Sequence, residues 1–389
     1  MDKKVVLKPG KEKIIARRHP WIFSGAIALL PPIQDGEILP VHSQSGEFLA
    51  QAYFHSKNSI AGRILSFDRR PIKEVIYEKI KQAHAWRQHL FQNSATNAFR
   101  LINSEGDELP GLVVDSYAGV LVVQINTCGM ESLKPLIVEA LITIVQPKAI
   151  YEKSTSSARR MEGLADAQGW LLGEEIPEVE IQENGLRFIV SLTQGQKTGF
   201  FLDQREMRRL PGRFCQDKKV LNCFSYSAAF SIFALKCGAK EVISVDSCPR
   251  ANKLAEKNTL LNGFSQESHK IIKADVFDYL RQEFPPADIV ILDPPAFVKK
   301  KSEVDSACRG YKEINRLAFE QMPANSLLLT CSCSYYVDEK LFQNLIFQAA
   351  NEAGRTVKII SRHLQALDHP VLLNHPEGEY LKSLLLQID

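Results

Sequence analysis

The sequence predicts an α/β protein with a β-rich module at its N-terminus and a doubly wound parallel sheet in its C-terminal half. From about Val179 onward, short apolar stretches alternate with segments of helical periodicity. Stretches such as Ile289–Leu292 are continuously hydrophobic, as expected of parallel strands covered by helices on both faces. The first 70 residues instead contain short apolar stretches separated by turn-forming pairs such as Pro9-Gly10 and Asp35-Gly36.

The chain of 389 residues is long enough for two or three domains at about 150 residues each. Its 45% hydrophobic and 24% charged residues are ordinary for globular proteins, which excludes global disorder. The longest apolar runs, at 289–292 and 327–329, are too short to span a bilayer. The start of the chain shows no signal-peptide pattern, and the eight cysteines form no Cys-x-x-Cys pair. We therefore expect a cytoplasmic protein with reduced thiols, no membrane segment and no metal site.

Positive charge is concentrated near the N-terminus. Residues 1–70 contain eleven Lys or Arg and six Asp or Glu, a net charge of +5, whereas the whole chain carries only +3. A basic module on a nearly neutral body points to a polyanionic partner such as nucleic acid. A solvated basic face is the alternative explanation of the same charge.

The elements between the two ends suggest a central α+β unit. Segment 72–91 has apolar residues at helical spacing and is expected to be a connecting helix. Segments 112–115 and 120–125 are expected to form a hairpin, followed by a helix over 133–145 and a strand beginning at 149. We therefore predict three domains: 1–72, 73–178 and 179–389.

In the C-terminal domain the strands and helices alternate regularly. We expect strands at 219–222, 241–245, 271–274, 289–292 and 326–331, and helices at 228–237, 249–262 and 307–322. Such alternation is typical of a doubly wound sheet, in which ligands bind beyond the carboxyl ends of the strands.

Aspartates follow three successive predicted strands: Asp246, Asp275 and Asp293. An acid after the second strand is suited to accept hydrogen bonds from two ribose hydroxyls, and one after the third strand can meet an adenine amino group. One such aspartate is often only a helix cap. Three at consecutive strand ends favour an adenosine-containing ligand.

The loop after the first strand favours S-adenosylmethionine (SAM) over a dinucleotide. Its residues Phe224-Ser225-Tyr226-Ser227 contain no Gly-x-Gly-x-x-Gly, so a close approach of a pyrophosphate is not supported. Small residues at 227–229 still allow the backbone to approach a ligand that lacks a diphosphate. A plain turn between strand and helix is the alternative.

The segment Asp293-Pro294-Pro295-Ala296-Phe297 places a stiff, extended backbone directly after a strand. Such a loop can present a carboxylate and carbonyls to a planar base, with Phe297 close enough to stack. A proline-rich turn without a ligand is the alternative.

Two cysteines lie at the end of the last predicted strand, 326–331. Cys331 and Cys333 share a face because strand side chains alternate, and Cys333 lies nearer the carboxyl end. A free cysteine is usually a small buried hydrophobic residue, which we expect of Cys331. A thiolate beside Asp293 can instead attack C6 of a pyrimidine and make C5 electron-rich enough to take a methyl group. Cys333 is therefore the candidate nucleophile.

Several blocks along the chain carry a family resemblance. They are Arg18-His19-Pro20-Trp21-Ile22-Phe23, Glu105-Gly106-Asp107, Pro110-Gly111-Leu112-Val113-Val114-Asp115, Gln196-Lys197-Thr198-Gly199-Phe200-Phe201-Leu202-Asp203-Gln204-Arg205, Asp293-Pro294-Pro295, Cys308-Arg309-Gly310-Tyr311-Lys312, Ser332-Cys333-Ser334, Asp368-His369-Pro370 and Pro376-Glu377-Gly378-Glu379-Tyr380-Leu381-Lys382. With these blocks the chain resembles the RlmI-like 23S ribosomal RNA large subunit (cytosine-5-)-methyltransferases over nearly its whole length.

The resemblance implies an N-terminal PUA RNA-binding domain, a central α+β linking domain and a C-terminal class I, Rossmann-like methyltransferase domain. It implies SAM as the methyl donor, 23S ribosomal RNA as the partner and a homodimer as an option. Cys333 and Asp293 would be catalytic. Residues implied to bind the cofactor are Lys197, Phe224, Ser225, Tyr226, Ser227, Asp246, Asp275, Asp293 and Pro294. Residues implied to bind the substrate are Gln204, Arg205, Pro295, Phe297, Arg309, Tyr311 and Lys312.

The main hypothesis is therefore a SAM-dependent methyltransferase that modifies C5 of a cytosine in large-subunit ribosomal RNA. A methyltransferase acting on an RNA nitrogen, for example of guanine, would need no thiol and is the first alternative. The second alternative is a non-catalytic RNA-binding or ribosome-assembly protein that kept the fold. A functional Cys333 would argue against the first alternative, and SAM binding against the second.

Overall fold

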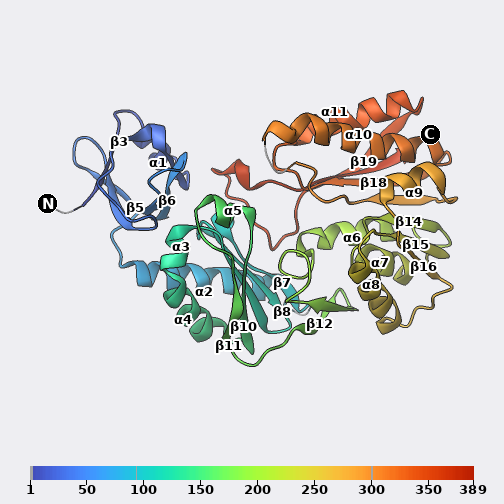
Figure 1. Ribbon diagram of the computed structural model, residues 1–389, viewed down its shortest axis with the longest axis horizontal. Helices are drawn as coiled ribbons and strands as arrows, with labels where there is room; N and C mark the ends of the chain where they lie inside the picture. The colour runs from blue at the N-terminus through green and yellow to red at the C-terminus, as the bar shows by residue number, and fades with distance from the viewer. Residues whose placement is uncertain (1–2, 93, 299–300) are drawn as a thin grey trace. The chain divides into compact units, whose positions relative to one another are not determined.

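The computed structural model describes residues 3–92, 94–298 and 301–389. The chain forms two compact units (Figure 1). The first unit consists of Met1–Ile181, Val190–Phe200 and Leu367–Gly378, and the second consists of Gln182–Ile189, Phe201–Ala366 and Glu379–Asp389. No helix in these described ranges combines the length and hydrophobicity needed to cross a bilayer.

The first sheet of the first unit is the expected β-rich module. Its strands are β1 (Val5–Leu7), β2 (Trp21–Phe23), β3 (Ile27–Leu29), β4 (Ile38–His42), β5 (Phe48–Phe54) and β6 (Ile60–Ser66). They pair in the order β2-β6-β5-β4-β1-β3, and a short helix, α1 (Glu12–Ala16), connects β1 to β2. Alternate strand residues, including Val41 and Phe54, are completely buried and form one core.

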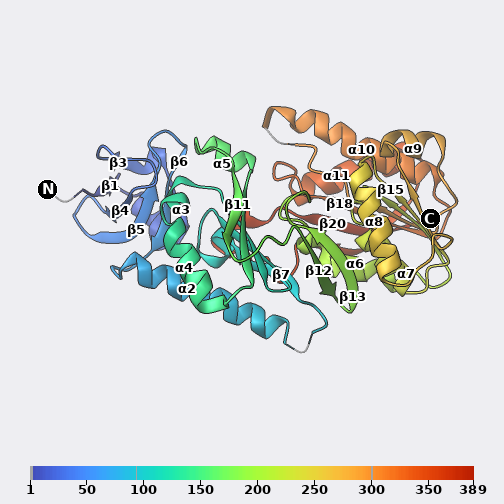
Figure 2. The ribbon, with the colours of Figure 1, turned by 60° about the horizontal axis from the view of Figure 1, so that its bottom comes forward.

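The second sheet of the first unit confirms the predicted helix and hairpin. The helix over 72–91 is α2 (Ile72–Leu90). The strands are β7 (Ala98–Asn103), β8 (Leu112–Tyr117), β9 (Val120–Ile125), β10 (Ala149–Ser154) and β11 (Ala167–Leu172), in the order β11-β10-β9-β8-β7. The other helices are α3 (Cys128–Ser132), α4 (Lys134–Val145) and α5 (Ser157–Met161). Figure 2 shows α2 and α4 side by side, and both contribute to the core beneath this sheet.

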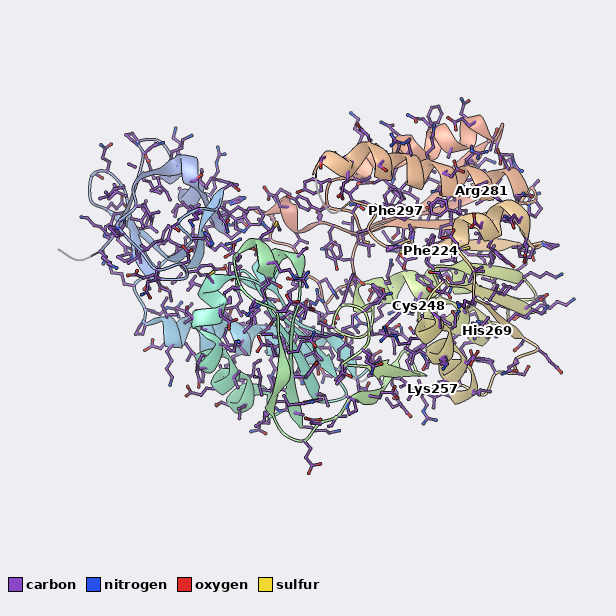
Figure 3. All side chains as sticks on the ribbon, viewed as in Figure 1. Phe224, Cys248, Lys257, His269, Arg281 and Phe297 are labelled. Atoms are coloured by element: carbon purple, nitrogen blue, oxygen red, sulfur yellow. The ribbon has the colours of Figure 1, made fainter. Side chains whose placement is uncertain are left out.

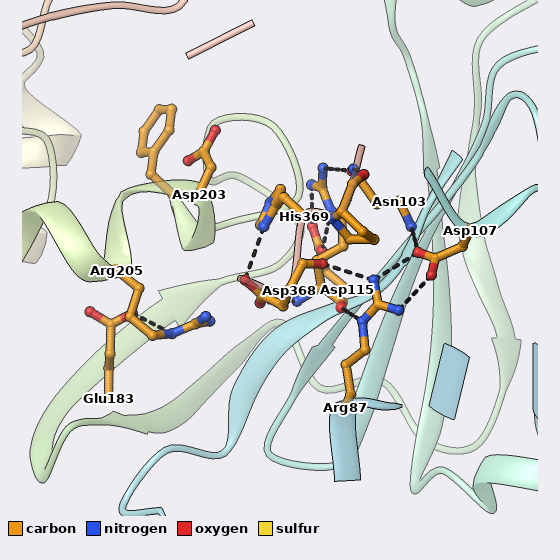
Figure 4. Close-up of polar contacts among 12 residues, drawn as sticks. Arg87, Asn103, Asp107, Asp115, Glu183, Asp203, Arg205, Asp368 and His369 are labelled. Atoms are coloured by element: carbon orange, nitrogen blue, oxygen red, sulfur yellow. Dashed lines mark hydrogen bonds and ion pairs between the residues drawn. The ribbon is translucent and has the colours of Figure 1, made fainter. Parts of the chain in front are cut away.

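A buried arginine joins the C-terminal segment 367–378 to the central sheet (Figure 4). Arg87 is completely buried, and its terminal nitrogens donate to the Asp107 carboxylate at 2.6 and 2.7 Å. The same guanidinium donates to the backbone carbonyl of Asp368 at 2.8 Å. The Asp368 carboxylate in turn accepts from the backbone N–H of Arg100. A buried charge is tolerated only when its donors are engaged, so segment 367–378 is an integral part of the first unit.

The second unit contains the expected doubly wound sheet. Its strands are β14 (Lys219–Cys223), β15 (Glu241–Val245), β16 (His269–Ile272), β17 (Ile289–Leu292), β18 (Ser326–Ser332), β19 (Val357–His363) and β20 (Lys382–Ile388). They pair in the order β16-β15-β14-β17-β18-β20-β19. Strands β14 to β18 are parallel, whereas β20 runs antiparallel to both β18 and β19. A separate two-stranded sheet pairs β12 (Glu178–Glu183) with β13 (Leu186–Ser191).

Helices cover both faces of the seven-stranded sheet (Figure 1). They are α6 (Arg205–Gly212), α7 (Ala229–Lys236), α8 (Pro249–Leu261), α9 (Val276–Gln282), α10 (Val304–Gln321) and α11 (Glu339–Glu352). One face buries Ile314 of α10 and Phe342 of α11, and the other buries Met207 of α6 and Phe230 of α7. Burial on both faces explains why the strands are continuously apolar in the sequence.

Two predicted elements in this unit are displaced by more than one residue. The third strand spans His269–Ile272 rather than 271–274, because its first two residues are polar and do not look like a strand. Asp275 therefore does not directly follow a strand. Helix α10 begins at Val304 rather than at 307.

A chain of buried polar side chains explains how His269 is accommodated in a strand. Its Nε2 lies 2.7 Å from the Ser244 hydroxyl, and its Nδ1 lies 2.7 Å from the Thr259 hydroxyl. Ser244 continues the chain to Ser231 at 2.6 Å, and Asn222 donates to Ser231 at 2.9 Å. Both ring nitrogens therefore have a hydrogen-bond partner, which a histidine that is only 2% exposed requires.

We predict that His269 makes the second unit sensitive to mild acid. Burial lowers the pKa of His269 from 6.5 to about 4, so the unfolded chain binds this proton first as the pH falls. The neutral, buried His269 therefore contributes its full share to the free energy of unfolding above pH 6.5. This contribution falls by about 3 kcal/mol between pH 6.5 and pH 4. Urea unfolding of the wild type and His269→Gln should show a stability difference that shrinks by this amount from pH 7 to pH 4. Parallel pH curves of the two proteins would contradict the prediction.

Candidate active site

The register of the parallel strands brings four predicted site segments to one edge of the sheet. Cys223, the last residue of β14, pairs with Val245 of β15 and with Leu292 of β17. Leu292 pairs in turn with Thr330 of β18. The residues that follow these strand ends therefore emerge side by side, at the edge where doubly wound sheets bind ligands.

The loop after β14 has an unusual backbone. Phe224, Tyr226 and Ala228 have φ angles of 58°, 45° and 61°, in the left-handed region that favours glycine. Such residues cost on the order of 1 kcal/mol each and persist where the surroundings hold them, often at ligand sites. Two of the holding contacts are the Ser225 N–H to the Val245 carbonyl at 3.2 Å and the Asn258 amide to the Ser227 carbonyl at 3.1 Å.

Asp246 directly follows β15 and contacts this loop. One carboxylate oxygen accepts the backbone N–H of Tyr226 at 2.9 Å, and the other accepts that of Cys248 at 2.8 Å. A carboxylate has about four acceptor positions, so each oxygen can accept a further hydrogen bond. The side chain is only half-buried, so these acceptor positions are accessible to a polar ligand.

The residues around Asp246 fit a polar adenosine ligand such as SAM. The Ser225 hydroxyl and the Asn252 side-chain oxygen are buried and have no hydrogen-bond partner in the described protein. Buried polar atoms of this kind are normally satisfied, so the two atoms point to a polar ligand or ordered water at the loop. The other Asn252 side-chain atom donates to the Asp246 carbonyl at 3.1 Å, which keeps the two residues together.

Asp275 is an exposed helix cap. One of its carboxylate oxygens accepts the backbone N–H groups of Phe277 and Asp278, the second and third residues of α9, at 2.9 and 3.2 Å. This is the ordinary N-cap arrangement. The structure thus gives Asp275 a local role that is sufficient to explain its presence.

Asp293 directly follows β17 and is oriented by Gln204. The Gln204 amide donates to one Asp293 oxygen at 2.9 Å, and Gln204 itself is only 3% exposed. Gln204, predicted to contact substrate, therefore lies in position to orient the Asp293 carboxylate. Arg205, its neighbour, is buried against Glu183, with 3.5 Å between Arg205 Nε and the carboxylate (Figure 4).

The proline loop leads into an aromatic cluster. Pro294 is buried and Pro295 is exposed. Phe297 is half-buried, and its ring centroid lies 4.7 Å from that of Tyr311 and 6.5 Å from that of Phe224. Figure 3 labels Phe224 and Phe297, which approach each other from different loops. These contacts stiffen the loop that carries Asp293.

Cys333 is the first residue beyond β18, and Cys331 lies inside the strand. Cys331 is completely buried in the core between the sheet and α6 and α7. Burial, together with the nearby charge of Asp293, raises the pKa of the Cys331 thiol well above its ordinary value. Cys333 is half-buried, and its Sγ lies 4.0 Å from the Pro294 carbonyl oxygen. Of these two thiols, Cys333 is the one that combines partial exposure with a contact to the proline loop.

Residues of α10 support this strand end. Tyr311 is completely buried, and its hydroxyl lies 2.8 Å from that of Ser334. Lys312 forms an ion pair with Glu352 at 2.8 Å, and Arg309 is exposed. Of these three predicted substrate contacts, Arg309 is the one with a freely accessible side chain.

Lys197 belongs to the first compact unit, where it is exposed and has a φ of 49°. The adjacent Thr198 is buried, and its hydroxyl donates to the Asp115 carboxylate at 2.6 Å. The structure thus explains how the Lys-Thr-Gly turn is anchored within its own unit.

Two residues that hold segments of the site in place, Tyr380 and Lys382, were not assigned a role from the sequence. The Tyr380 hydroxyl donates to Asp203 at 2.8 Å, next to Gln204. The ammonium of Lys382 donates to the carbonyls of Ser334 and Tyr380, both at 2.7 Å. Both residues occur in the C-terminal block Pro376-Glu377-Gly378-Glu379-Tyr380-Leu381-Lys382. Its part in the family resemblance was the sequence feature that could have pointed to them.

One group of side chains in the described residues has the composition of a metal site. His55, Cys128 and Glu162, in the first unit, bring their ligand atoms within 4.8 Å of one another. Two of its members already have hydrogen-bond donors from the protein. His55 Nδ1 accepts from the Lys57 N–H, and the Glu162 carboxylate accepts from Arg63. The hydrogen bonds alone account for its geometry.

Comparisons with known families cover both ends of the chain. Residues 105–371 match the family described as S-adenosylmethionine-dependent methyltransferase, and residues 5–67 match a PUA-like domain family. The first match spans more than half of the chain and includes the sheet edge with Asp246, Asp293 and Cys333.

Individual relatives agree over the full length. Ribosomal RNA large subunit methyltransferase I of Vibrio vulnificus is 41% identical over 396 residues, and that of Escherichia coli is 38% identical over 395 residues. Each match covers 100% of both chains.

Two solved structures share the fold. A Streptococcus mutans protein assigned as a SAM-dependent methyltransferase has a TM-score of 0.85 at 25% identity over 99% of this chain and 100% of its own. A second solved structure, of a protein assigned as a methyltransferase in complex with S-adenosylhomocysteine (SAH), has a TM-score of 0.86 at 26% identity with the same coverage. These matches confirm the resemblance found in the sequence. The chain belongs to the ribosomal RNA large subunit methyltransferase I family of SAM-dependent methyltransferases.

Proposed function

We propose that this chain transfers a methyl group from SAM to C5 of a cytosine in 23S ribosomal RNA, with Cys333 as covalent nucleophile. The observation that carries the proposal is the position of Cys333, one residue beyond β18, with its Sγ 4.0 Å from the Pro294 carbonyl. Asp246 and Asp293 follow β15 and β17, the two strands that flank β14 in the same sheet. The names of the full-length relatives support large-subunit ribosomal RNA as the substrate.

The chemistry divides between the nucleophile and the carboxylate. When bound, SAM supplies a methyl group on a positively charged sulfur. The Cys333 thiolate would form a bond to C6, the electrons of the C5–C6 double bond would shift through C4 toward N3, and N3 would take up a proton from solvent. Asp293 would accept a hydrogen bond from this N3–H and favour the adduct. The C5 atom would then take the methyl group as the C4–N3 double bond re-forms, and the donor would leave as S-adenosylhomocysteine. A base then removes the C5 proton, the C5–C6 double bond re-forms, Cys333 leaves as a thiolate, and N3 releases its proton.

The remaining assignments extend this function to the whole chain. We propose that 1–72 is a PUA domain that binds RNA, that 73–178 links it to the catalytic domain, and that 179–389 carries SAM. The substrate would be free or partly assembled 23S ribosomal RNA in the cytoplasm. A homodimer stays a prediction, which light scattering coupled to size-exclusion chromatography checks.

We predict that Cys333→Ala lowers methyl transfer by roughly 10³-fold or more while SAM and RNA still bind, because only the covalent step is lost. The matched variant Cys331→Ala should keep its activity and lose about 1 kcal/mol of stability, because it removes a small buried side chain. Transfer of labelled methyl groups to ribosomal RNA measures the activity, and mass spectrometry of nucleosides identifies the methylated atom.

A trapping experiment identifies the attacking thiol directly. RNA with 5-fluorocytosine at the target should form a stable adduct with Cys333, because fluorine at C5 cannot leave as a proton does. An adduct on Cys331, or full activity of Cys333→Ala, would refute the nucleophile assignment. Methylation found on a ring nitrogen would favour the nitrogen-methyltransferase alternative.

We predict that Asp246→Ala weakens SAM binding by roughly 10- to 100-fold, because hydrogen bonds to a charged carboxylate contribute about 1.5 to 3 kcal/mol. Isothermal titration calorimetry measures this effect. Asp278→Ala is the matched control, because Asp278 is an exposed aspartate of α9 that pairs with Arg281. Equal SAM affinity of all three proteins would contradict the role of Asp246.

We predict that RNA affinity falls steeply with salt and depends on exposed cations of the first unit. Lys11, Lys13 and Arg17 are exposed on and beside α1. Replacing all three by Glu should lower RNA affinity and flatten the slope of log K against log[salt] by about 0.7 to 0.9 per lost phosphate contact. The control variant replaces Lys236, Lys240 and Lys253 of the second unit by Glu. Unchanged RNA affinity of the first variant, measured by fluorescence anisotropy, would refute the assignment.

A further inference from the structure

The central sheet of the first unit has a groove at one of its ends. Ala98 of β7 pairs with Tyr117 of β8, Tyr117 pairs with Val120 of β9, and Val120 pairs with Ala149 of β10. The residues just outside these four positions therefore emerge at the same end of the sheet. A groove of about 890 Å³ lies there, lined by residues from the last two turns of α2, the start of β7, the β8–β9 turn and the end of α4. All of these residues belong to the first unit.

The lining of this groove carries positive but no negative side chains. Its described residues include Arg87 and Lys148, two histidines and three side-chain amides, and none of them is Asp or Glu. The sequence shows the same bias, because residues 79–104 contain four Lys or Arg and no acid. Arg87 is already paired with Asp107, so the exposed Lys148 supplies positive charge that a ligand can reach. A groove of this composition favours an anionic ligand.

The backbone fixes Lys148 at the edge of the groove. Its N–H donates to the Gly119 carbonyl at 2.9 Å, which ties the residue to the β8–β9 turn. The aliphatic part of its side chain lies over Gly119, since a Cβ at that glycine would be 3.5 Å from Lys148 Cε. Lysine commonly packs its stem in this way and keeps its ammonium in water, where it can meet a phosphate.

Aromatic rings line the same groove. Phe91 and Phe99 are half-buried, and their rings stack with centroids 5.1 Å apart and planes 14° apart. A planar base that enters the groove can extend this stack. Trp86 of α2 is 47% exposed, and its ring lies 5.7 Å from that of His89, which also lines the groove. Proteins that hold unpaired nucleotides combine such rings with positive charge.

Side-chain amides add hydrogen-bonding groups to the groove. Gln88, Gln92 and Asn97 line it and are exposed. Gln88 is oriented by His84, whose Nε2 lies 3.1 Å from the amide nitrogen. Each amide offers both donors and an acceptor, so it can bond to a base edge or to a ribose 2′-hydroxyl.

We propose that this groove binds a single-stranded segment of the RNA substrate, with a base on the Phe91–Phe99 stack and a phosphate at Lys148. This inference rests on the proposed function, in which RNA is the substrate. It gives the central domain, 73–178, an RNA-binding role in addition to its linking role. Duplex RNA does not suit the groove, because its bases are stacked on one another and cannot reach the phenylalanine rings.

The test measures binding of the full-length protein to a fluorescent oligouridine of roughly a dozen nucleotides, a length within the range of single-strand sites. We expect Phe91→Leu to lower the affinity by about fivefold or more, because the variant keeps an apolar side chain but loses the stacking ring. We expect Lys148→Gln to flatten the slope of log K against log[salt] by about 0.7, the value for one lost phosphate contact with a single strand. Fluorescence anisotropy measures both effects, and circular dichroism shows that each variant is folded.

Two exposed residues away from the groove offer matched controls. Lys73 lies in the first turn of α2, at the opposite end of the helix from the groove, and pairs with Glu139 at 3.0 Å. Phe347 is 69% exposed on α11 of the second unit. Lys73→Gln and Phe347→Leu should bind oligouridine like the wild type, so that an effect of the groove variants reflects the groove and not the loss of any lysine or ring.

Three outcomes would overturn the inference. The first is wild-type affinity and salt slope in the folded groove variants. The second is an equal loss of affinity of Phe91→Leu for oligouridine and for an RNA duplex of the same length, because stacking on an unpaired base predicts a loss for the single strand alone. The third uses only the wild type and applies even when a variant fails to fold: ultraviolet crosslinks to oligouridine, mapped by mass spectrometry, would all lie outside residues 84–99 and 145–148. Absence of methyl transfer to ribosomal RNA by the wild type would instead refute the proposed function, and the binding and crosslinking data would still decide the role of the groove.

Discussion

The parallel hydrogen-bond register of β14, β15, β17 and β18 is the constraint on which the second unit and its site depend. Because Cys223 pairs with both Val245 and Leu292, the residues after all three strands emerge at one level. A shift by one residue in any strand would turn its buried side chains to the opposite face. The apolar cores on both faces of the sheet therefore fix the positions of Asp246 and Asp293 as firmly as they fix the strands.

The antiparallel strand β20 extends this constraint to the end of β18. Seven residue pairs, from Ser326↔Ile388 to Ser332↔Lys382, align the two strands along their whole length. The strand pairing ends at Lys382, and beyond it the Lys382 ammonium donates a hydrogen bond to the Ser334 carbonyl. The chain thus leaves the sheet at Cys333 under restraint from both sides, since the Tyr311 hydroxyl contacts Ser334 from α10. This restraint provides the pre-organisation that a nucleophile needs.

The sequence was sufficient for the features that depend on local pattern. Continuous apolar strands followed by Asp246, Asp293 and Cys333 located the site edge, because the carboxyl ends of parallel strands share an edge. The pattern failed where polar residues are buried with specific partners. His269 and Lys382 both begin strands, yet each is accommodated by contacts with residues distant in sequence. Likewise, the burial of Arg87 with Asp368 joins residues 281 positions apart, and local periodicity contains no information about such a pair.

The two neighbouring cysteines show how position in the sheet sets chemical role. Cys331 and Cys333 are two residues apart. Cys331 is affected by the charge of Asp293, and Cys333 lies against the carbonyl of Pro294. Cys331 lies within the hydrogen-bonded strand, so packing on the sheet removes it from water and keeps it protonated. Cys333 lies one residue beyond the strand, where partial exposure reduces the cost of a charge. Two residues of strand thus separate an inert core thiol from a candidate nucleophile, which explains why a second cysteine in this segment need not compete for the chemistry.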